Sequence, residues 1–332
     1  MHYMAQEDRY NRMKYQRTGT SGLMLPVMSL GMWHNFGYGS SYENARQIML
    51  GSFDCGITHF DLANNYGPPA GAAEELVGNI LRKDLTAYRD ELIISTKAGY
   101  EMWPGPYGRH GSKKHLLASV EQSLKRLGTD YVDIFYHHCP DQETPLWETM
   151  DALVQIVRSG KALYIGLSNY EPHRLEEAAQ ILENMGCRCL VHQHRYSMLE
   201  RSEKKLLPVI KARRMGSIAY CPLAQGLLTD RYLKGIPEDS RAAGNSVFLK
   251  QDNITPEYLK LAGNLNQIAQ SRGQTLAQMA LAYAILDGEL TSVILGASRI
   301  GQIKDNMKAL SNLEFSEEER LEIEKLLINL EK

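Results

Sequence analysis

The chain has 332 residues, with 43% hydrophobic and 23% charged side chains, a composition that excludes disordered, collagen-like and low-complexity proteins. Its formal net charge of −2 gives no overall attraction to nucleic acid or to an anionic membrane. No apolar run reaches the roughly 18 residues of a membrane helix, and the polar segment Met1–Arg17 lacks the apolar stretch of a signal peptide. We therefore predict a cytoplasmic protein that binds neither nucleic acid nor membranes.

The cysteines indicate neither a disulfide framework nor a metal site. Their number, five, is odd, and the chain is long, so buried reduced thiols are expected. Cys187 and Cys189 form a Cys-x-Cys pair, but no second pair or histidine cluster completes a zinc set. We predict no bound metal.

The first predicted element is a β-hairpin over residues 13–25. Polar residues 14–17 and apolar residues 23–25 flank a Thr-Gly-Thr-Ser-Gly turn. Its position before the repeating part of the chain predicts that it closes the base of the fold.

Strand-like and helix-like stretches then alternate along the chain. Eight short apolar, β-branched runs have the length of strands. They are 28–32, 59–63, 92–98, 132–138, 162–168, 190–195, 217–223 and 292–297. Helical patterns lie between or after them at 44–54, 74–83, 116–127, 146–159, 173–185, 203–214 and 303–310.

Eight alternating units are the number that closes a (β/α)8 TIM barrel. A doubly wound open sheet is the alternative, but its Gly-x-Gly-x-x-Gly motif occurs nowhere in the sequence. We predict one barrel domain over residues 1–332. Residues 224–291, between strands seven and eight, form a long insertion with helical patterns at 256–270 and 276–286, and a terminal helix is predicted at 317–331.

Ionisable residues end three consecutive predicted strands. Asp61, Lys97 and His138 lie at these ends, and Tyr66 follows the first of them in the next loop. The C-terminal ends of barrel strands meet at one face, and neighbouring strands lie roughly 5 Å apart, so these side chains are predicted to converge. A solvated strand cap explains one such residue; four together favour a site.

The chemistry of these four residues suits protonation of an oxygen that gains negative charge. A tyrosine with its ordinary pKa of about 10 is a poor acid near neutrality. A neighbouring Lys97 cation, held by Asp61, would lower that pKa. His138 would orient a carbonyl oxygen.

The order of short motifs resembles the aldo-keto reductase family over nearly the whole chain. The matching stretches are Gly56–Gly67, Ile94–Lys97, Tyr131–His138, Ile165–Tyr170, Tyr220–Leu223 with Gln225–Thr229, and Ile294–Arg299. Asn64–Pro69 and Trp103–Gly108 resemble the branch that includes the voltage-gated potassium channel β subunits.

The resemblance implies a barrel that binds NADPH without a dinucleotide-binding fold. Tyr66 would be the general acid, Lys97 the partner that lowers its pKa, and Asp61 the residue that holds Lys97. His138 would orient the carbonyl, because it lies seven residues after Tyr131, as the family histidine does. Channel subunits often carry asparagine there, so His138 favours an active enzyme.

The resemblance also implies a set of cofactor-binding residues. Ser168, Asn169 and Gln193 match positions that hold the nicotinamide carboxamide, and Tyr220 matches the ring that stacks on the nicotinamide. The remaining positions would wrap the pyrophosphate and phosphates or bind a 2′-phosphate. These are Trp33 beside the pocket, then Pro222, Leu223, Gln225, Gly226, Leu227, Arg231, Arg241, Gly296, Ser298, Arg299, Gln302 and Asn306. A helix start, core packing and exposed loop charge are the simpler explanations for several of them.

Substrate residues are expected on the loops after strands one and three. Trp33, Trp103, Tyr107 and Arg109 would shape the pocket, and Arg109 or Lys113 would meet a substrate phosphate. The implied substrates are short aldehydes such as glyceraldehyde 3-phosphate or methylglyoxal. Relatives of this subgroup assemble, so a homo-oligomer, a tetramer or larger, is expected.

Two other functions are considered beside the reductase. A channel-type regulatory subunit would bind NADPH as a sensor and turn over slowly. A metal-dependent hydrolase would need a ligand cluster, and His192 and His194 alternate on a predicted strand without a carboxylate partner at suitable spacing.

Overall fold

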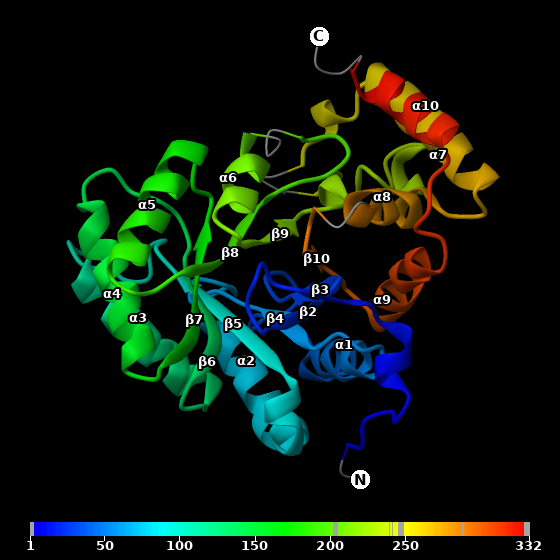
Figure 1. Ribbon diagram of the computed structural model, residues 1–332. Coiled ribbons are helices and arrows are strands. Elements are labelled where there is room, and N and C mark those ends of the chain that lie inside the picture. Colours follow the sequence, from blue (N-terminus) through cyan, green and yellow to red (C-terminus); the bar gives the residue numbers. More distant parts are fainter. Residues whose placement is uncertain are drawn as a thin grey trace.

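The computed structural model describes residues 3–201, 205–238, 240, 242–244, 249–286 and 289–328 (Figure 1). Eight parallel strands close into a barrel in the order β10-β3-β4-β5-β6-β7-β8-β9. They are β3 (Met28–Gly31), β4 (His59–Asp61), β5 (Ile93–Ala98), β6 (Val132–His137), β7 (Ala162–Ser168), β8 (Cys189–Arg195), β9 (Gly216–Tyr220) and β10 (Ser292–Leu295). The predicted (β/α)8 barrel is confirmed.

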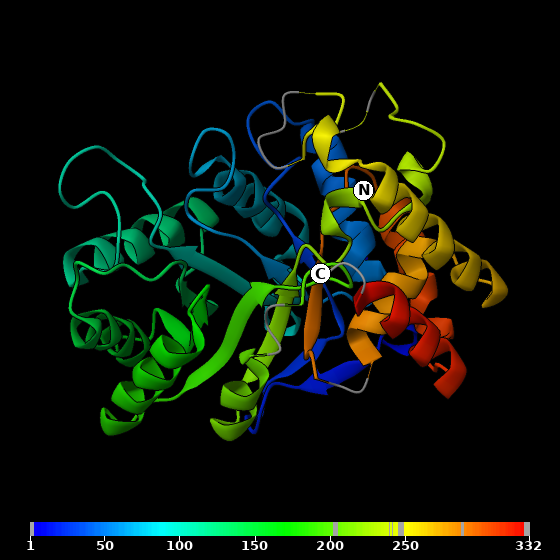
Figure 2. The same ribbon diagram turned by 90° about the horizontal axis from the view of Figure 1, so that it is seen from above.

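Helices surround this barrel and follow its strands along the chain (Figures 1 and 2). They are α1 (Tyr42–Asp54), α2 (Ala72–Ile80), α3 (Lys113–Leu127), α4 (Leu146–Arg158), α5 (Pro172–Asn184), α6 (Leu207–Ala212), α7 (Pro256–Ser271), α8 (Leu276–Ile285), α9 (Ile300–Met307) and α10 (Glu317–Ile328).

Local sequence explains the bounds of α3. The Ser112 hydroxyl accepts a hydrogen bond from the His115 amide at its start, and Gly128 takes a left-handed conformation, φ 67°, at its end. Leu116, Val120 and other residues at helical spacing are buried on the face toward the barrel.

The helix expected at 203–214 is shorter in the structure. α6 spans Leu207–Ala212, and Pro208 lies in its first turn, where a missing amide hydrogen costs nothing. Residues 202–204 lie outside the described part of the chain.

The predicted hairpin is present and closes the base of the barrel. Strands β1 (Tyr15–Arg17) and β2 (Met24–Pro26) pair antiparallel. Leu25 is fully buried and packs in one cluster with residues of the barrel interior. Those interior residues include Ile93, Ile134, Leu190, Ile218 and Ile294. Figure 2 shows the hairpin strands in dark blue below the barrel strands.

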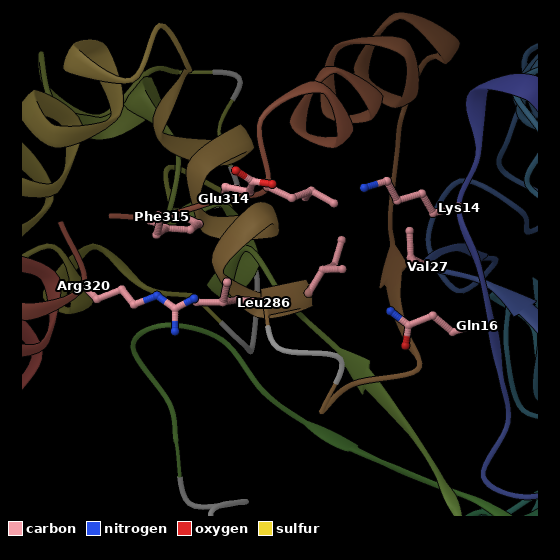
Figure 3. Close-up of a pocket in the computed structure, with 9 residues that line it drawn as sticks. Lys14, Gln16, Val27, Leu286, Glu314, Phe315 and Arg320 are labelled. Atoms are coloured by element: carbon pink, nitrogen blue, oxygen red, sulfur yellow. The ribbon is translucent and has the colours of Figure 1, made fainter. Parts of the chain in front are cut away.

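A cavity of about 500 Å³ lies at the same end of the molecule. Lys14 and Gln16 of the hairpin face Leu286 and Phe315 across it, and Val27 lies beside them (Figure 3). Val27 directly precedes β3, so the cavity belongs to the N-terminal end of the barrel. Barrel enzymes carry their reaction sites at the opposite end.

Between β9 and β10 the chain forms α7 and α8, and α10 packs against α7 (Figure 1). α8 is buried on all sides, which explains its continuous apolar sequence. Arg201, after β8, makes two hydrogen bonds to Glu324 of α10, at 2.7 and 2.8 Å, and so joins the terminal helix to the loops of the barrel.

Candidate active site

The four predicted catalytic side chains come together at the C-terminal end of the barrel. Asp61 is the last residue of β4, and Lys97 is the last residue but one of β5. His138 directly follows β6, and Tyr66 lies in the loop after β4. The register pairs Asp61 with Ser95 and Lys97 with Tyr136, which brings the ends of β4, β5 and β6 to one level.

Asp61 and Lys97 form a buried ion pair. Lys97 Nζ donates to Asp61 Oδ2 at 2.6 Å and to the Leu62 carbonyl at 2.6 Å. The exposed fractions of the two side chains are 2% and 0%. Burial lowers the pKa of Lys97 from its ordinary value, while the Asp61 carboxylate acts in the opposite direction. Two charges buried this deeply need each other, because a lone buried charge is strongly destabilising.

Tyr66 lies beside this pair. Lys97 Nζ is 5.1 Å from the centre of the Tyr66 ring. The Trp33 ring stacks on Tyr66 with ring centres 5.7 Å apart, and His138 meets Tyr66 edge to face at 5.8 Å. Trp33 thus faces the site, as predicted.

The expected direction of the Tyr66 pKa shift is wrong for this structure. Burial, and then the Asp61 carboxylate, raise the pKa of Tyr66 well above its ordinary value. The expectation considered the Lys97 cation and left out both the burial of the ring and the Asp61 charge. Tyr66 therefore holds its proton at neutral pH, as a donor must, but it is a weaker acid than the sequence predicts.

His138 is a neutral imidazole in this setting. Burial, and then the Lys97 cation, lower its pKa well below the ordinary 6.5. Its Nδ1 is buried and meets no hydrogen-bond partner within the described residues. Tyr100, in the loop after β5, packs edge-on against the His138 ring at 4.6 Å. A neutral histidine has one N–H, which can donate to a carbonyl oxygen.

The end of β7 carries features that fit an amide ligand. Ser168 Oγ is fully buried and, among the residues described, has no hydrogen-bond partner. Such a group costs free energy unless a ligand satisfies it. Asn169 takes a left-handed φ of 62°. Its amide donates to the His138 carbonyl at 2.9 Å and accepts from the Tyr220 hydroxyl at 2.8 Å.

Gln193, on β8, is the third residue predicted to bind the nicotinamide carboxamide. It also contacts the ion pair, because its Nε2 donates to Asp61 Oδ1 at 3.1 Å. The structure thus brings Ser168, Asn169, Gln193 and Tyr220 to the same barrel end as the four catalytic candidates.

The backbone after β9 departs from ordinary conformations. Cys221, Ala224 and Gln225 have φ of 56°, 46° and 60°, and Gly226 has 102°. Non-glycine residues in this region are strained by about 1–3 kcal/mol each and cluster at ligand sites. The segment also holds the predicted Pro222, Leu223 and Leu227. Arg231 is exposed in the following turn, and Arg241 lies outside the described residues.

All but one of the residues predicted to hold a 2′-phosphate lie at the start of α9. Gly296 and Ser298 follow β10, and Arg299 caps the helix. Gln302 Oε1 accepts from the Ser298 amide at 2.7 Å, and Asn306 is buried farther along the helix.

The predicted substrate residues after β5 contact their own loop and α3. Trp103 packs against His115 with ring centres 5.0 Å apart. Tyr107 is half exposed, and Arg109 is exposed beside Glu101 and Glu143 in a surface cavity. Lys113 is ion-paired with Asp151 at 2.7 Å. This contact argues against Lys113 as a phosphate ligand.

Sequence reasoning missed His59 and Ser95, which join the buried polar network of the site. Each lies two residues before a predicted catalytic residue, His59 before Asp61 and Ser95 before Lys97. Residues two apart on a strand share a face. This spacing is the signal that would have found them.

No group of three or more histidine, cysteine, aspartate or glutamate side chains is placed to hold a metal ion in the described part of the chain. Of the helices in the same residues, none has both the length and the apolar character needed to cross a membrane.

The chain is similar to known proteins in both sequence and fold. A family model described as "Aldo/keto reductase family" matches residues 27–328. The aldo-keto reductase AKR11C1 from Bacillus halodurans, solved in a holo form, superposes with a TM-score of 0.77 at 28% identity. The match covers 95% of this chain and 96% of that one.

Two kinds of curated protein are similar over most of their length. L-glyceraldehyde 3-phosphate reductase of Escherichia coli O157:H7 is 53% identical over 329 residues, which is 98% of this chain and 95% of the relative. A probable voltage-gated potassium channel subunit beta of Arabidopsis thaliana is 38% identical over 307 residues, covering 90% of this chain and 91% of the relative.

Proposed function

The chain belongs to the aldo/keto reductase family and is an oxidoreductase. We propose that it reduces short aldehydes to alcohols with NADPH, with Tyr66 as the proton donor. The observation that carries the proposal is the buried Asp61–Lys97 pair beside Tyr66 and a neutral His138. A reaction that builds negative charge on a carbonyl oxygen needs a donor and an orienting group at that place.

Each of the four residues has one role in this proposal. The neutral His138 donates a hydrogen bond that orients the aldehyde oxygen. Tyr66 gives its proton to that oxygen as negative charge develops on it. Lys97, held by Asp61, stabilises the phenolate that Tyr66 leaves, and solvent returns the proton afterwards. When bound, the dihydronicotinamide supplies the hydride that reduces the carbonyl carbon.

The cofactor-binding residues are proposed from the same arrangement. Ser168, Asn169 and Gln193 would hold the carboxamide, and the partly buried Tyr220 would stack on the ring. The strained segment after β9 would approach the pyrophosphate. A serine, an arginine and the amides at the start of α9 suit a 2′-phosphate, so NADPH is proposed rather than NADH.

The proposed substrates are glyceraldehyde 3-phosphate, methylglyoxal and similar short aldehydes. The names of the reductase relatives support the first of these. Trp33, which stacks on Tyr66, would form one wall of the substrate pocket, with Trp103 and Tyr107 farther out on the loop after β5. Arg109, exposed in that loop, is the remaining candidate for a phosphate contact.

A slow, NADPH-binding regulatory subunit is the second candidate, because channel-subunit relatives cover 90% of the chain. It would share the cofactor site and differ in turnover. Retention of His138, where channel subunits often carry asparagine, supports the reductase.

The first prediction tests the acid role. Tyr66→Phe should lower kcat for glyceraldehyde 3-phosphate reduction by about 10²–10⁴-fold, the usual contribution of a general acid. NADPH binding should stay intact, because the ring remains. The measurements are NADPH oxidation followed by absorbance and NADPH affinity followed by fluorescence titration.

Tyr42→Phe is the matched control, because the buried Tyr42 hydroxyl on α1 has no hydrogen-bond partner in the described residues. Undiminished turnover by Tyr66→Phe would refute the acid role. If the unaltered protein binds NADPH but reduces none of the short aldehydes, the regulatory subunit replaces the reductase. Equal rates with NADH and NADPH would contradict the 2′-phosphate site.

We also propose that the barrel is one domain, works in the cytoplasm and assembles as a homo-oligomer, a tetramer or larger. Light scattering on the eluting protein measures the assembly.

A further inference from the structure

We propose that His59, Ser29 and Ser95 are positioning residues that align Asp61, and through it Lys97 and Tyr66, by a one-way chain of hydrogen bonds inside the barrel. This inference rests on the proposed function, because it assigns a purpose to groups behind the proton donor.

The chain is continuous and crosses four neighbouring strands. Ser292 Oγ on β10 lies 2.7 Å from Ser29 Oγ on β3, and Ser29 Oγ lies 2.8 Å from His59 Nδ1 on β4. His59 Nε2 lies 2.9 Å from Ser95 Oγ on β5, and Ser95 Oγ donates to Asp61 Oδ1 at 2.7 Å. All five side chains are buried, at 2% exposure or less.

The direction of every bond follows from the last one. The single proton of Ser95 is used on the Asp61 carboxylate, which can only accept. Ser95 therefore accepts from His59, whose proton must lie on Nε2. Burial lowers the pKa of His59 to about 4, so the ring is neutral and Nδ1 is an acceptor.

The same logic continues to β10. Because Nδ1 accepts, Ser29 donates to it, and Ser29 in turn accepts from Ser292. Every donor along the chain points toward Asp61. One tautomer of His59 is fixed, because the opposite tautomer would draw the Ser95 proton to Nε2 and leave the carboxylate facing a lone pair.

The chain completes the set of donors around Asp61. Oδ1 accepts from Ser95 and Gln193, and Oδ2 accepts from Lys97. A carboxylate with three donors has one orientation, and its charge is shared among them. Because Asp61 raises the pKa of Tyr66, each donor on Asp61 limits that effect and keeps Tyr66 a stronger acid.

Packing alone does not explain these residues. The interior of such a barrel is ordinarily filled by Val, Ile and Leu. A buried polar chain is costly unless every member is satisfied, and here the contacts form an unbroken series. The neighbouring interior residues Ile93, Ile134 and Ile294 show that the same barrel accepts apolar residues at this depth.

The test compares Ser95→Ala, His59→Leu and His59→Gln with Ser217→Ala. Ser217 is an equally buried serine on β9 whose hydroxyl has no partner among the residues described, so it controls for loss of a buried hydroxyl. Glutamine can still donate an amide hydrogen toward Ser95, and leucine cannot. Ser29→Ala tests the link behind His59 if Ser95→Ala does not fold.

Ser95→Ala and His59→Leu should lower kcat about tenfold, the scale of one charge-assisted hydrogen bond. KM for the aldehyde should change little. The basic limb of the kcat–pH profile should move to higher pH, because Tyr66 becomes a weaker acid. His59→Gln should recover most of the kcat that His59→Leu loses. Ser29→Ala should lower kcat, as His59→Leu does. Ser217→Ala should have the kcat of the unaltered enzyme.

Two results would overturn the inference. One is Ser95→Ala and His59→Leu behaving like Ser217→Ala. The other is a fall in kcat that follows the melting temperature, with an unmoved pH limb and no recovery by His59→Gln, which would mean that the chain serves folding alone. Failure of the proposed function is separate, since it would appear in Tyr66→Phe.

Discussion

At the scale of single residues, the site combines two neutral side chains, Tyr66 and His138, with one buried ion pair, Asp61 and Lys97. Tyr66 and His138 are neutral, because burial raises the pKa of the phenol and lowers that of the imidazole. Asp61 and Lys97 neutralise each other over 2.6 Å. An aldehyde therefore meets two hydrogen-bond donors that carry no charge until the reaction begins.

This arrangement predicts the pH dependence of reduction. Since the pKa of His138 is lowered, the imidazole is already neutral below its ordinary pKa of about 6.5, and kcat should not change as the pH is raised through that value. Since the pKa of Tyr66 is raised, kcat should fall only above about pH 10. Steady-state rates across this range, with the folded fraction followed by circular dichroism at each pH, are the measurement. A fall in kcat with a midpoint near pH 6.5 would show that the reaction needs a cationic His138.

The convergence of the four candidate catalytic residues could be predicted from the sequence, but their electrostatics could not. Asp61, Lys97 and His138 each lie within one residue of a strand end, and that position is visible in a pattern of apolar runs. The direction of the Tyr66 pKa depends on how deeply the ring is buried and on its distances from two opposite charges. His59 and Ser95 lie two residues before Asp61 and Lys97, so only the alternation of side chains along the two strands indicates that they belong to the site.

At the scale of elements, the loop between β5 and α3 is fastened at one glycine. The Gly111 amide donates to Asp141 Oδ2 at 2.7 Å, and its carbonyl accepts from Thr149 at 3.0 Å. A Cβ at this position would lie 2.5 Å from Thr149 Oγ1 and 3.0 Å from Asp141 Oδ2. Both backbone groups are thus held from the β6–α4 region, which fixes where the loop carries Trp103 and Tyr107.

Gly111→Ala should displace this loop without unfolding the barrel. The clash should cost about 1–3 kcal/mol, as overpacking does. It should raise KM for the aldehyde several-fold while leaving KM for NADPH unchanged, because the loop lies on the side of the site away from β9 and α9. Gly39→Ala, where a Cβ meets open space, is the control. An unchanged aldehyde KM would show that the loop takes no part in substrate binding.

At the scale of the whole molecule, the hairpin and the barrel share one interior. Leu25 enters the barrel from below and completes a core to which five strands contribute isoleucine, leucine or valine side chains. Met24, its neighbour on the same strand, is 41% exposed. Leu25 therefore contributes to stability through the shared interior, and the exposed Met24 does not.

Leu25→Ala should lower the free energy of unfolding by about 2–5 kcal/mol, because it leaves a cavity where side chains from several strands meet. Met24→Ala should change it by no more than about 0.5 kcal/mol. Urea unfolding followed by tryptophan fluorescence measures both. Equal effects of the two substitutions would mean that the hairpin is only loosely attached to the barrel.

Most of the fold could be predicted, because alternation of strands and helices is a local signal repeated along the chain. The bounds of α6 could not, since they depend on Pro208 and on contacts made after the chain has folded. The backbone conformations of the segments after β9 and β5 could not be predicted from the sequence either. Left-handed backbone at Cys221 and Ala224 has no signature in residue type, and the position of Arg109 depends on how Gly111 is held.

The barrel closes between strands that are far apart in the chain: Ser29 on β3 and Ser292 on β10 are 263 residues apart. On the ribosome β3 emerges early and β10 last of the eight strands, so a growing chain carries unpaired sheet edges through most of its synthesis. Such edges invite wrong pairing with other chains, and contacts of this separation form slowly. Because Ser292 is also the farthest donor of the proposed chain behind Asp61, the pairing of β10 with β3 that removes these edges also completes that chain.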